Sequence, residues 1–477
     1  MSKKIGNNGD LGISIIGLGY VGLCTAVSFA ERGLRVYGIE IDEAKRKKIS
    51  SGVAPLHEPG LEPMLRSTLK SGFFSCSRDF DKAIKSSEIT FLTVGTPSRA
   101  TGAIDLQYIE SAAMEVGHCL ATKQSYHVVV VKSTVTPGTT EGVVRAILEE
   151  ESGRKCGEDF GLCVNPEFLR EGSAIDDTMN PDAVVIGSAD QRATQSLIKL
   201  YERFYAKLPP TIVTTISSGE FVKYSVNTFR ANQLSFLNTL ANLCEKTSGA
   251  DVVEVVRGLS TVTKIDPRYL RAGFGFGGSC LPKDLRALTA RAKELDVDSS
   301  LLEASAHVNE KQPLHAVEMS RQLIGEIRGK RIAVLGLAFK AETDDVRESV
   351  AIKVANALAD AGASVVAYDP QAMQNAREFL RPGIALAKDS HSCLLKADCC
   401  VIATEWNEFR KIEPKVFVSL MRTPAIVDGK RIFDGTKFKS AGIKLSSLGR
   451  NGPAEHEIQD PIVVGGRKRV LNRRLSR

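Results

Sequence analysis

The stretch ISIIGLGYVGLCTAVSFAERGLRVYGIEID, residues 13–42, carries the pattern on which the fold prediction depends. Its first residues form an apolar run typical of a fully buried strand, and residues 34–42 have the same character. Between them, closely spaced glycines predict a tight turn that opens a helix. Strand, turn, helix and strand in this order predict a βαβ unit with two parallel strands.

Similar units extend outward from this stretch. The apolar runs ITFLTVG (89–95) and HVVVVKST (127–134) alternate with helical stretches, which predicts a Rossmann-like, doubly wound parallel-sheet domain over residues 1–205. The pattern restarts with KRIAVLGLAFK (330–340), ASVVAYDP (363–370) and ADCCVIATEW (397–406), which predicts a second Rossmann-like domain over 328–447. Its glycine loop lacks the dinucleotide spacing, so a second cofactor site is not expected.

The region between the two domains, residues 206–327, is dominated by one helical pattern. Residues 217–249 carry apolar side chains at helical spacing, with Ser218 as the expected cap and Gly249 as the expected stop. One helix of about 30 residues should therefore join the domains. A helix of this length also suggests a subunit interface, and we expect a homodimer or a larger homo-oligomer.

Composition excludes several classes of protein. At 477 residues the chain is too long for one core. The net charge of +7 includes six basic residues in the last twelve, so the rest of the chain is near +1 and no nucleic-acid partner is expected. The tail 448–477 lacks periodicity and is predicted to be disordered.

Targeting and metal signals are also weak. No apolar run approaches the roughly 18 residues of a membrane-spanning helix, and the polar start of the chain is unlike a signal peptide, so we expect a cytoplasmic protein without a membrane partner. The ten cysteines lack paired metal-ligand spacing, and several lie in apolar runs. We expect no metal site and mostly buried thiols.

The first glycine turn predicts a cofactor site. Gly17, Gly19 and Gly22 form G-x-G-x-x-G between a strand and a helix, where backbone N–H groups can reach a pyrophosphate. Glu40 ends the next strand, where a carboxylate binds ribose hydroxyls and repels a 2′-phosphate, which favours NAD over NADP. The alternatives are glycines used for packing with Glu40 as a surface charge, and FAD, which uses the same fingerprint.

The stretch GFGFGGSCLPKD, residues 273–284, surrounds one thiol with glycines. Glycines permit positive φ angles and close approach of the backbone to a ligand, and Lys283 could lower the pKa of the Cys280 thiol. Alone, a cysteine is more often a small buried hydrophobic residue than a nucleophile. Beside an NAD site, it suggests oxidation of an aldehyde through a thiohemiacetal and a thioester.

Over residues 12–447 the chain resembles the UDP-glucose and GDP-mannose 6-dehydrogenases. The matching stretches are GLGYVGL, EPGLE (58–62), VGTPS (94–98), KSTVTPGT (132–139), NPEFLREGSAIDD (165–177), VKYSVNTF (222–229), GFGFGGSCLPKD, GLAFKAETDDVRES (336–349) and DGKRIFDG (428–435). The resemblance implies a four-electron oxidation of a nucleotide sugar's C6 alcohol to a carboxylate, with two NAD reduced in turn.

The resemblance also implies roles for single residues. Cys280 would be the nucleophile, Lys223 and Asn227 would hold the oxyanion, and Asp284 would orient or activate water. Glu167 matches the general base for thioester hydrolysis, while Thr134 and Glu171 match positions near the reacting water and the nicotinamide. The implied cofactor set is Gly17, Gly19, Tyr20, Val21, Gly22, Glu40, Lys45, Thr96, Thr134, Glu171, Lys283 and Arg347. The implied substrate set is Glu167, Phe168, Leu169, Lys223, Asn227, Tyr269, Leu270, Arg271, Gly277, Lys340 and Arg431.

Different parts of the sequence favour different sugar nucleotides as the substrate. The form GGSC-x-PKD differs from the UDP-N-acetylmannosamine relatives, which leaves glucose or mannose. The loop around Cys280 resembles GDP-mannose enzymes, whereas ATEWNEFRKI (403–412) and DGKRIFDG resemble UDP-glucose enzymes, and we favour UDP-glucose. The family's Arg-Ile-Gly is Lys264-Ile265-Asp266 here, and its Asn-Glu pair is Asn238-Thr239. A two-electron hydroxyacid dehydrogenase and a catalytically silent NAD-binding protein are the competing interpretations.

Overall fold

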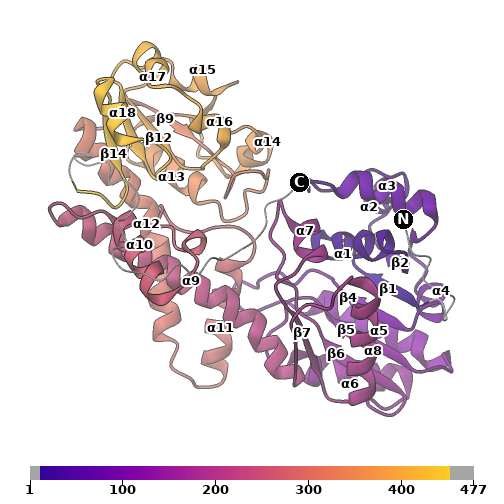
Figure 1. Ribbon diagram of the computed structural model, residues 1–477. Coiled ribbons are helices and arrows are strands. Elements are labelled where there is room, and N and C mark those ends of the chain that lie inside the picture. The colour runs from indigo at the N-terminus through magenta and orange to yellow at the C-terminus, as the bar shows by residue number, and fades with distance from the viewer. Residues whose placement is uncertain (1–10, 452–477) are drawn as a thin grey trace.

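The computed structural model describes residues 11–451, and Figure 1 shows two α/β domains connected by helices. The first domain is built on an eight-stranded sheet in the order β3-β2-β1-β4-β5-β6-β7-β8. In that order the strands are Phe74–Ser77, Arg35–Ile39, Gly12–Ile16, Ile89–Leu92, His127–Val131, Phe160–Val164, Val184–Ser188 and Thr211–Thr214. Every residue of β1 and β5 is buried, as expected for strands covered on both faces.

The helices of the first domain connect these strands. They are α1 (Tyr20–Glu31), α2 (Glu43–Ser50), α3 (Leu61–Ser71), α4 (Phe80–Lys85), α5 (Gln107–Thr122), α6 (Arg145–Ser152), preceded by a π-helical turn at Thr140–Val144, α7 (Ala174–Met179) and α8 (Gln191–Phe204). Ile16 pairs with both Ile39 and Leu92, so β1, β2 and β4 end at the same edge of the sheet. The loops that follow these strands meet there, as in other dinucleotide-binding sheets.

The second domain repeats the architecture on a six-stranded, all-parallel sheet in the order β11-β10-β9-β12-β13-β14. The strands in that order are Ala385–Leu386, Ser364–Tyr368, Arg331–Leu335, Cys399–Ile402, Ala425–Asp428 and Lys444–Ser447. The helices are α13 (Val350–Asp360), α14 (Met373–Ala376), α15 (Ser390–Leu394), α16 (Asn407–Arg410), α17 (Pro414–Leu420) and α18 (Gly435–Ser440). The predicted fold of two parallel-sheet α/β domains is confirmed.

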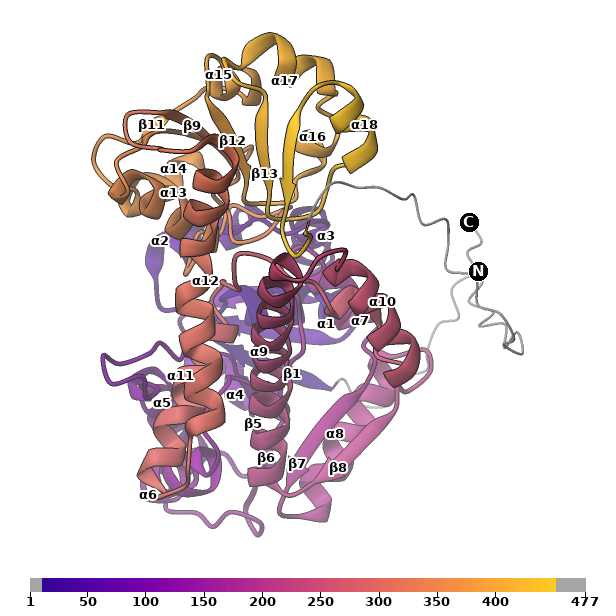
Figure 2. The same ribbon diagram turned by 90° about the vertical axis from the view of Figure 1, so that its left-hand side faces the viewer.

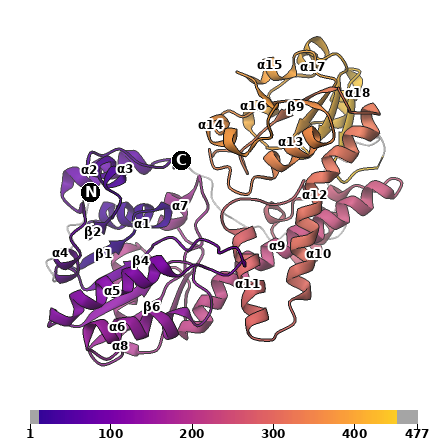
Figure 3. The same ribbon diagram turned by 180° about the vertical axis from the view of Figure 1, so that it is seen from behind.

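Four helices lie between the sheets: α9 (Ile216–Lys246), α10 (Val252–Thr263), α11 (Leu281–Glu294) and α12 (Ser300–Ile324). α11 and α12 both pack against α9, and α12 also packs against α13 of the second domain. Figure 2 shows α9 and α12 running side by side between the domains, and Figure 3 shows the same helices from behind. The predicted long connecting helix is therefore present, with 31 residues.

Three expectations differ from the structure. β7 pairs antiparallel with β6, because the segment between them stays at the edge where β6 ends and the chain returns in the opposite direction. α9 begins before Ser218: the Thr215 side chain accepts from the Ser218 amide and caps the helix. Leu448 is fully buried and Gly449 N donates to Glu245 Oε1 at 2.7 Å, so residues 448–451 pack against the protein.

Further expectations concern the tail, the end of the first domain and the membrane. The remainder of the predicted tail, residues 452–477, lies outside the described residues. The first sheet continues past residue 205, because β8 pairs with β7. No helix within residues 11–451 is long and apolar enough to cross a membrane. The cytoplasmic location stays a prediction.

Candidate functional site

The glycine turn after β1 has the geometry of a phosphate-binding loop. Gly17 has φ +90°, and its N–H donates to Ile39 O at 2.9 Å. A Cβ on Gly22 would lie 2.0 Å from Gly17 O, so only glycine permits this approach of helix to turn. A Cβ on Gly19 would meet nothing within 4 Å, so the helix N-terminus is open to an anionic ligand.

The loops that follow the neighbouring strands add polar groups to this edge. Glu40 directly follows β2 and is buried, with its carboxylate 2.7 Å from Lys45 Nζ and accepting from Asp42 N at 3.1 Å. Thr96 Oγ1 donates to Thr134 O at 2.9 Å, which joins the loops after β4 and β5. The turn, the acid and these loops fit a nicotinamide dinucleotide.

A buried carboxylate connects the glycine turn to the segment between β6 and β7. Glu58 accepts from the Tyr20 hydroxyl and from the amides of Gly172 (2.7 Å) and Ala174 (2.8 Å). Burial is the largest influence on Glu58 and raises the pKa of its carboxyl. The segment that carries Glu171 is therefore fastened to the first residue of α1.

The same segment contacts the second domain. The Lys340 ammonium donates to Glu171 O, and Arg347 Nη2 donates to Glu171 Oε1 at 3.2 Å while also pairing with Asp345. Burial, then the charge of Asp345, raises the pKa of Glu171 to about 7. Lys340 and Arg347 of the second domain thus reach the NAD side of the molecule.

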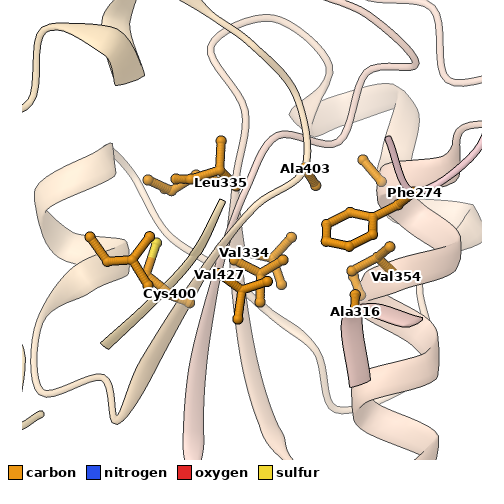
Figure 4. Packing of buried hydrophobic residues seen from close by; sticks show 14 of the residues in the cluster. Phe274, Ala316, Val334, Leu335, Val354, Cys400, Ala403 and Val427 are labelled. Carbon is orange, nitrogen blue, oxygen red and sulfur yellow. The ribbon is translucent and has the colours of Figure 1, made fainter. Parts of the chain in front are cut away.

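The loop that carries the thiol is anchored in the second domain. Phe274 is buried in that domain's apolar core, where Figure 4 shows its ring near Ala403 and Val354. Gly278 N donates to Arg347 O at 3.0 Å. A Cβ on Gly277 would lie 2.3 Å from Glu348 O, so a side chain there would displace the two segments. The glycines allow this close backbone packing.

Polar side chains of the connecting helices fix the other side of this loop. Asn238 Oδ1 on α9 accepts from Gly273 N at 2.8 Å. Asn309 on α12 accepts from Phe276 N at 2.7 Å and donates to Phe276 O at 2.9 Å. The loop is therefore held between both helices and the second domain.

Cys280 is the N-cap residue of α11. Its Sγ lies 3.5 Å from Ser279 Oγ, and the residue is accessible to solvent. Protein atoms nevertheless crowd the sulfur, and this desolvation raises the pKa of the thiol, opposed by the Ser279 hydrogen bond and the charge of Lys223. The positive end of α11 favours the thiolate at this position.

Four further predicted residues come together beside the thiol. Lys223 and Asn227 lie one turn apart on α9 and are both buried. Lys223 Nζ donates to Glu167 Oε1 at 2.8 Å and to Glu167 O at 2.7 Å. Asn227 Nδ2 donates to Asp284 Oδ2 at 2.6 Å. The charges of Cys280 and Asp284 both act on Lys223, which places the thiol in the same electrostatic cluster.

The Lys223–Glu167 pair differs from an ordinary surface ion pair, because both side chains are buried. Burial alone would raise the pKa of Glu167, but the charge and hydrogen bond of Lys223, the Leu169 amide and the charge of Lys132 hold it below the usual value. Burial alone would lower the pKa of Lys223, but the charge and hydrogen bond of Glu167 raise it above its usual value. Glu167 therefore stays ionised and Lys223 stays protonated, so the pair offers both a base and a strong donor.

A cavity of about 670 Å³ adjoins this cluster. Its lining includes Lys132, Glu167, Lys223, Asn227 and Tyr269, whereas Cys280 and Asp284 do not line it. The lining also includes Phe168 and Leu169, which were predicted to contact the substrate.

The remaining predicted cofactor and substrate residues have different surroundings. Arg431 donates to both carboxylate oxygens of Asp251 at 3.0 and 2.8 Å, at the start of α10. Leu270 is buried in the apolar core of the second domain, whereas Arg271 is exposed. The Tyr269 ring stacks under the Arg230 guanidinium, 4.4 Å from the ring centroid. Lys283 Nζ donates to Asp284 Oδ1 at 2.5 Å, so its charge is directed to that carboxylate rather than to the sulfur.

Lys132, Asn165 and Glu58 belong to the site but were not singled out from the sequence. All three are buried polar residues with several hydrogen bonds. A lysine directly after the apolar run of β5 was the available signal, because such a cation is costly to bury without partners.

A Rossmann glycine turn with its acidic partner, in a chain that also carries an accessible thiol and a buried lysine–carboxylate pair, is typical of the NAD-dependent α/β dehydrogenases. The chain belongs to the UDP-glucose/GDP-mannose dehydrogenase family. Residues 11–205 match the family's NAD binding domain, residues 217–311 its central domain and residues 333–435 its UDP binding domain. The protein is therefore an NAD-dependent enzyme that acts on a nucleotide sugar.

Individual relatives agree with this assignment over nearly the whole chain. The UDP-glucose 6-dehydrogenase TuaD of Bacillus subtilis is 39% identical over 95% of this chain and 96% of its own. A GDP-mannose 6-dehydrogenase of Pseudomonas syringae is 38% identical over 88% of this chain and 95% of its own. The solved structure of a UDP-glucose dehydrogenase from Pyrobaculum islandicum is 37% identical, with a TM-score of 0.84 over 93% of this chain and 99% of that one.

Proposed function

We propose that the protein oxidises UDP-glucose to UDP-glucuronate in two NAD-dependent steps, through a sugar bound covalently to Cys280. The observation that carries the proposal is the cluster of one thiol, one Lys–Glu pair and one Asn–Asp pair. It lies where the Cys280 loop, α9 and the NAD-binding domain meet. NAD at the glycine turn would accept one hydride in each step, so that two NAD molecules are reduced in turn.

The first step converts the C6 alcohol to an aldehyde. As the C6–H bond breaks, the alcohol proton passes to a carboxylate, a role that we assign to Asp284, which accepts a hydrogen bond from Asn227. The Lys223 ammonium and the Asn227 amide donate to the oxygen on which negative charge develops. Because both groups lie on one face of α9, they are oriented before the substrate arrives.

The second step uses the thiol. Cys280 adds as the thiolate to the aldehyde carbon and forms a thiohemiacetal anion, whose oxygen the same donors stabilise. Loss of a second hydride from C6 gives a thioester. Glu167 then takes a proton from water, the hydroxide adds to the thioester carbon, the C–S bond breaks and the carboxylate leaves. The thiolate is regenerated, so the balance is one acid and two NADH for each sugar.

The choice of UDP-glucose is supported by residues 403–412 and 428–435, which belong to the domain that matches the UDP binding domain. The alternative is GDP-mannose, oxidised by the same chemistry to GDP-mannuronate, and it is favoured by the sequence around Cys280. In this proposal the second domain binds the nucleobase, whereas the sugar lies near the thiol. The sequence of the second domain and the sequence around Cys280 therefore concern different parts of the substrate.

The test is turnover with each sugar nucleotide at equal concentration, with NADH counted by absorbance at 340 nm and the acid by chromatography. We expect kcat/KM for UDP-glucose to exceed that for GDP-mannose and two NADH for each uronate. The reverse preference would establish the GDP-mannose alternative. One NADH per sugar with an aldehyde product would identify a two-electron dehydrogenase and overturn the proposal.

We propose that the active form is a homodimer or larger homo-oligomer that covers α9. Phe229, Phe236 and Leu243 form one exposed stripe along α9, with side chains 60, 56 and 58% exposed. Static light scattering at micromolar concentration should give at least twice the chain mass. Phe236→Glu should shift it toward one chain, and a monomeric wild-type protein would refute the proposal.

A further inference from the structure

Lys132 is a buried cation that the steps above do not use. It directly follows β5 and has only 9% of its surface exposed. Its Nζ donates to Asn165 Oδ1 at 2.9 Å and lies 3.5 Å from Asn165 O. A lysine this deep needs a reason, because removing an ammonium from water costs several kcal/mol.

Its partner Asn165 directly follows β6 and opens the segment Asn165-Pro166-Glu167. Besides Lys132, Asn165 Oδ1 accepts from Tyr201 Oη at 2.5 Å, and Asn165 Nδ2 donates to Val185 O at 2.7 Å. The side chain of Asn165 is thus fixed by β5, β7 and α8 together. This network determines where the chain leaves β6, two residues before Glu167.

The charge of Lys132 also acts on the Glu167–Lys223 pair. Burial lowers the pKa of Lys132 to about 8, while the charge of Glu167 opposes and that of Lys223 reinforces this shift. Lys132 in turn is one of the groups that hold the pKa of Glu167 below its usual value. Among the described residues, the ionisable groups that act on this pair include Lys132 after β5 and Cys280 and Asp284 of the α11 region.

We propose that Lys132 is a positioning residue for thioester hydrolysis: it orients the Asn165–Glu167 segment and keeps the Glu167 carboxylate ionised as the base that activates water. This inference rests on the proposed function. In the step concerned, an O–H bond of water breaks, the proton goes to Glu167, the new C–O bond forms and the C–S bond to Cys280 breaks. The hydride transfers do not require Lys132.

The test is Lys132→Met, which shortens the side chain by one atom and removes its charge and donors. Rapid mixing with UDP-glucose and NAD should give a pre-steady-state burst of about two NADH per site, followed by steady turnover at least tenfold below wild type. Intact-protein mass spectrometry during turnover should show the uronyl adduct on Cys280. Glu167→Gln should accumulate the same adduct and serves as the positive control.

Tyr201→Phe is the matched control, because it removes one hydrogen bond to Asn165 without changing charge. We expect its acid limb of kcat to stay at the wild-type pH, because the charge beside Glu167 is unchanged. Lys132→Arg retains the charge and should restore most of the steady rate. The acid limb of kcat should move to higher pH in Lys132→Met and stay in place in Lys132→Arg, whereas a merely structural defect would lower kcat equally at every pH.

Wild-type turnover in Lys132→Met, or reduced turnover with an unmoved acid limb and no adduct, would overturn the inference. If circular dichroism shows that Lys132→Met is unfolded, Lys132→Gln receives the same measurements and the same two outcomes decide. These outcomes differ from a failure of the proposed function. In that case neither the wild-type enzyme nor Glu167→Gln would form a Cys280 adduct.

Discussion

The two Rossmann-like units of this chain share one framework and use it differently. Gly17 N donates to Ile39 O at 2.9 Å, and the corresponding Gly336 N donates to Tyr368 O at 2.8 Å. Both glycines have positive φ, +90° and +109°. An acidic residue follows the second strand of each unit, Glu40 after β2 and Asp369 after β10.

The difference lies in what the acid binds. Glu40 turns to Lys45 and Asp42 N and leaves the glycine turn free. Asp369 instead lies against its own loop, where Oδ2 accepts from the amides of Leu337 (2.7 Å) and Ala338 (2.9 Å). The amides that would bind a pyrophosphate are therefore already used. A repeated fold thus gives one dinucleotide site, because the donors remain free in only one unit.

The largest expected effect comes from closing the free turn. Gly19→Val should weaken NAD binding about a hundredfold, ~2.7 kcal/mol, because the new side chain occupies the open approach to the helix N-terminus. The melting temperature should change little, since a Cβ there meets no protein atom within 4 Å. Calorimetric titration with NAD measures the first effect and thermal melting the second. Unchanged NAD affinity would show that NAD does not bind at this turn.

The second unit should respond in stability rather than in binding. Asp369→Asn should lower the free energy of unfolding by about 2–3 kcal/mol, because its buried carboxylate also accepts from the Trp406 indole at 3.0 Å. NAD affinity should stay within a factor of two. Glu40→Gln is the matched variant and should behave oppositely, losing about tenfold in NAD affinity with little change in denaturant midpoint.

Lowering the pH should reduce the stability of the first unit, because His127 is buried there. Burial, reinforced by the charge of Lys123, lowers the pKa of this imidazole from 6.5 to about 3. Between these values the unfolded chain binds the proton and the folded chain does not, so stability is full above pH 6.5 and decreases as the pH falls. From pH 6.5 to 5 the loss is about 2 kcal/mol.

His127→Gln provides the control for this prediction. Wild type and variant are compared by urea unfolding at pH 7 and pH 5, and the stability lost between the two pH values should be smaller in the variant. Equal losses would show that the network of His127 with Thr90 (2.7 Å) and Ser87 O (3.1 Å) does not exclude the proton.

The smallest change is expected when glycines are introduced into the loop of the second unit. Ala338 and Ala341 stand in the second loop where Gly19 and Gly22 stand in the first. Restoring glycine at both positions should leave one NAD bound per chain, because Asp369 still occupies the loop amides. Equilibrium dialysis counts the bound NAD, and a stoichiometry of two would show that the missing glycines, rather than the occupied donors, prevent binding.

The sequence could predict the parts of the molecule that depend on local patterns. Apolar strands and the glycine turn indicated both sheets, and helical spacing placed Lys223 and Asn227 on one face. The start of α9 was wrong because Thr215 and Ser218 are equally good caps by residue type, and only the end of β8 decides between them.

Contacts between distant segments were beyond local patterns. The anchoring of Phe274 in the second core joins segments far apart in sequence, as do the bonds of Asn165 with Lys132 and Tyr201. The antiparallel return of β7 depends on where a 19-residue segment lies in space. The sequence does not show whether the acid after the second strand accepts from the amides of the glycine loop, because such an acid is present in both units.

The central claim is that one sulfur carries the sugar between two hydride transfers, and Cys280→Ser tests it most directly. NADH is counted per molecule of UDP-glucose consumed, together with the uronate formed. We predict two NADH and one uronate for the wild-type enzyme, and no net uronate for the variant. A variant that still gives two NADH and one uronate per sugar would contradict the account.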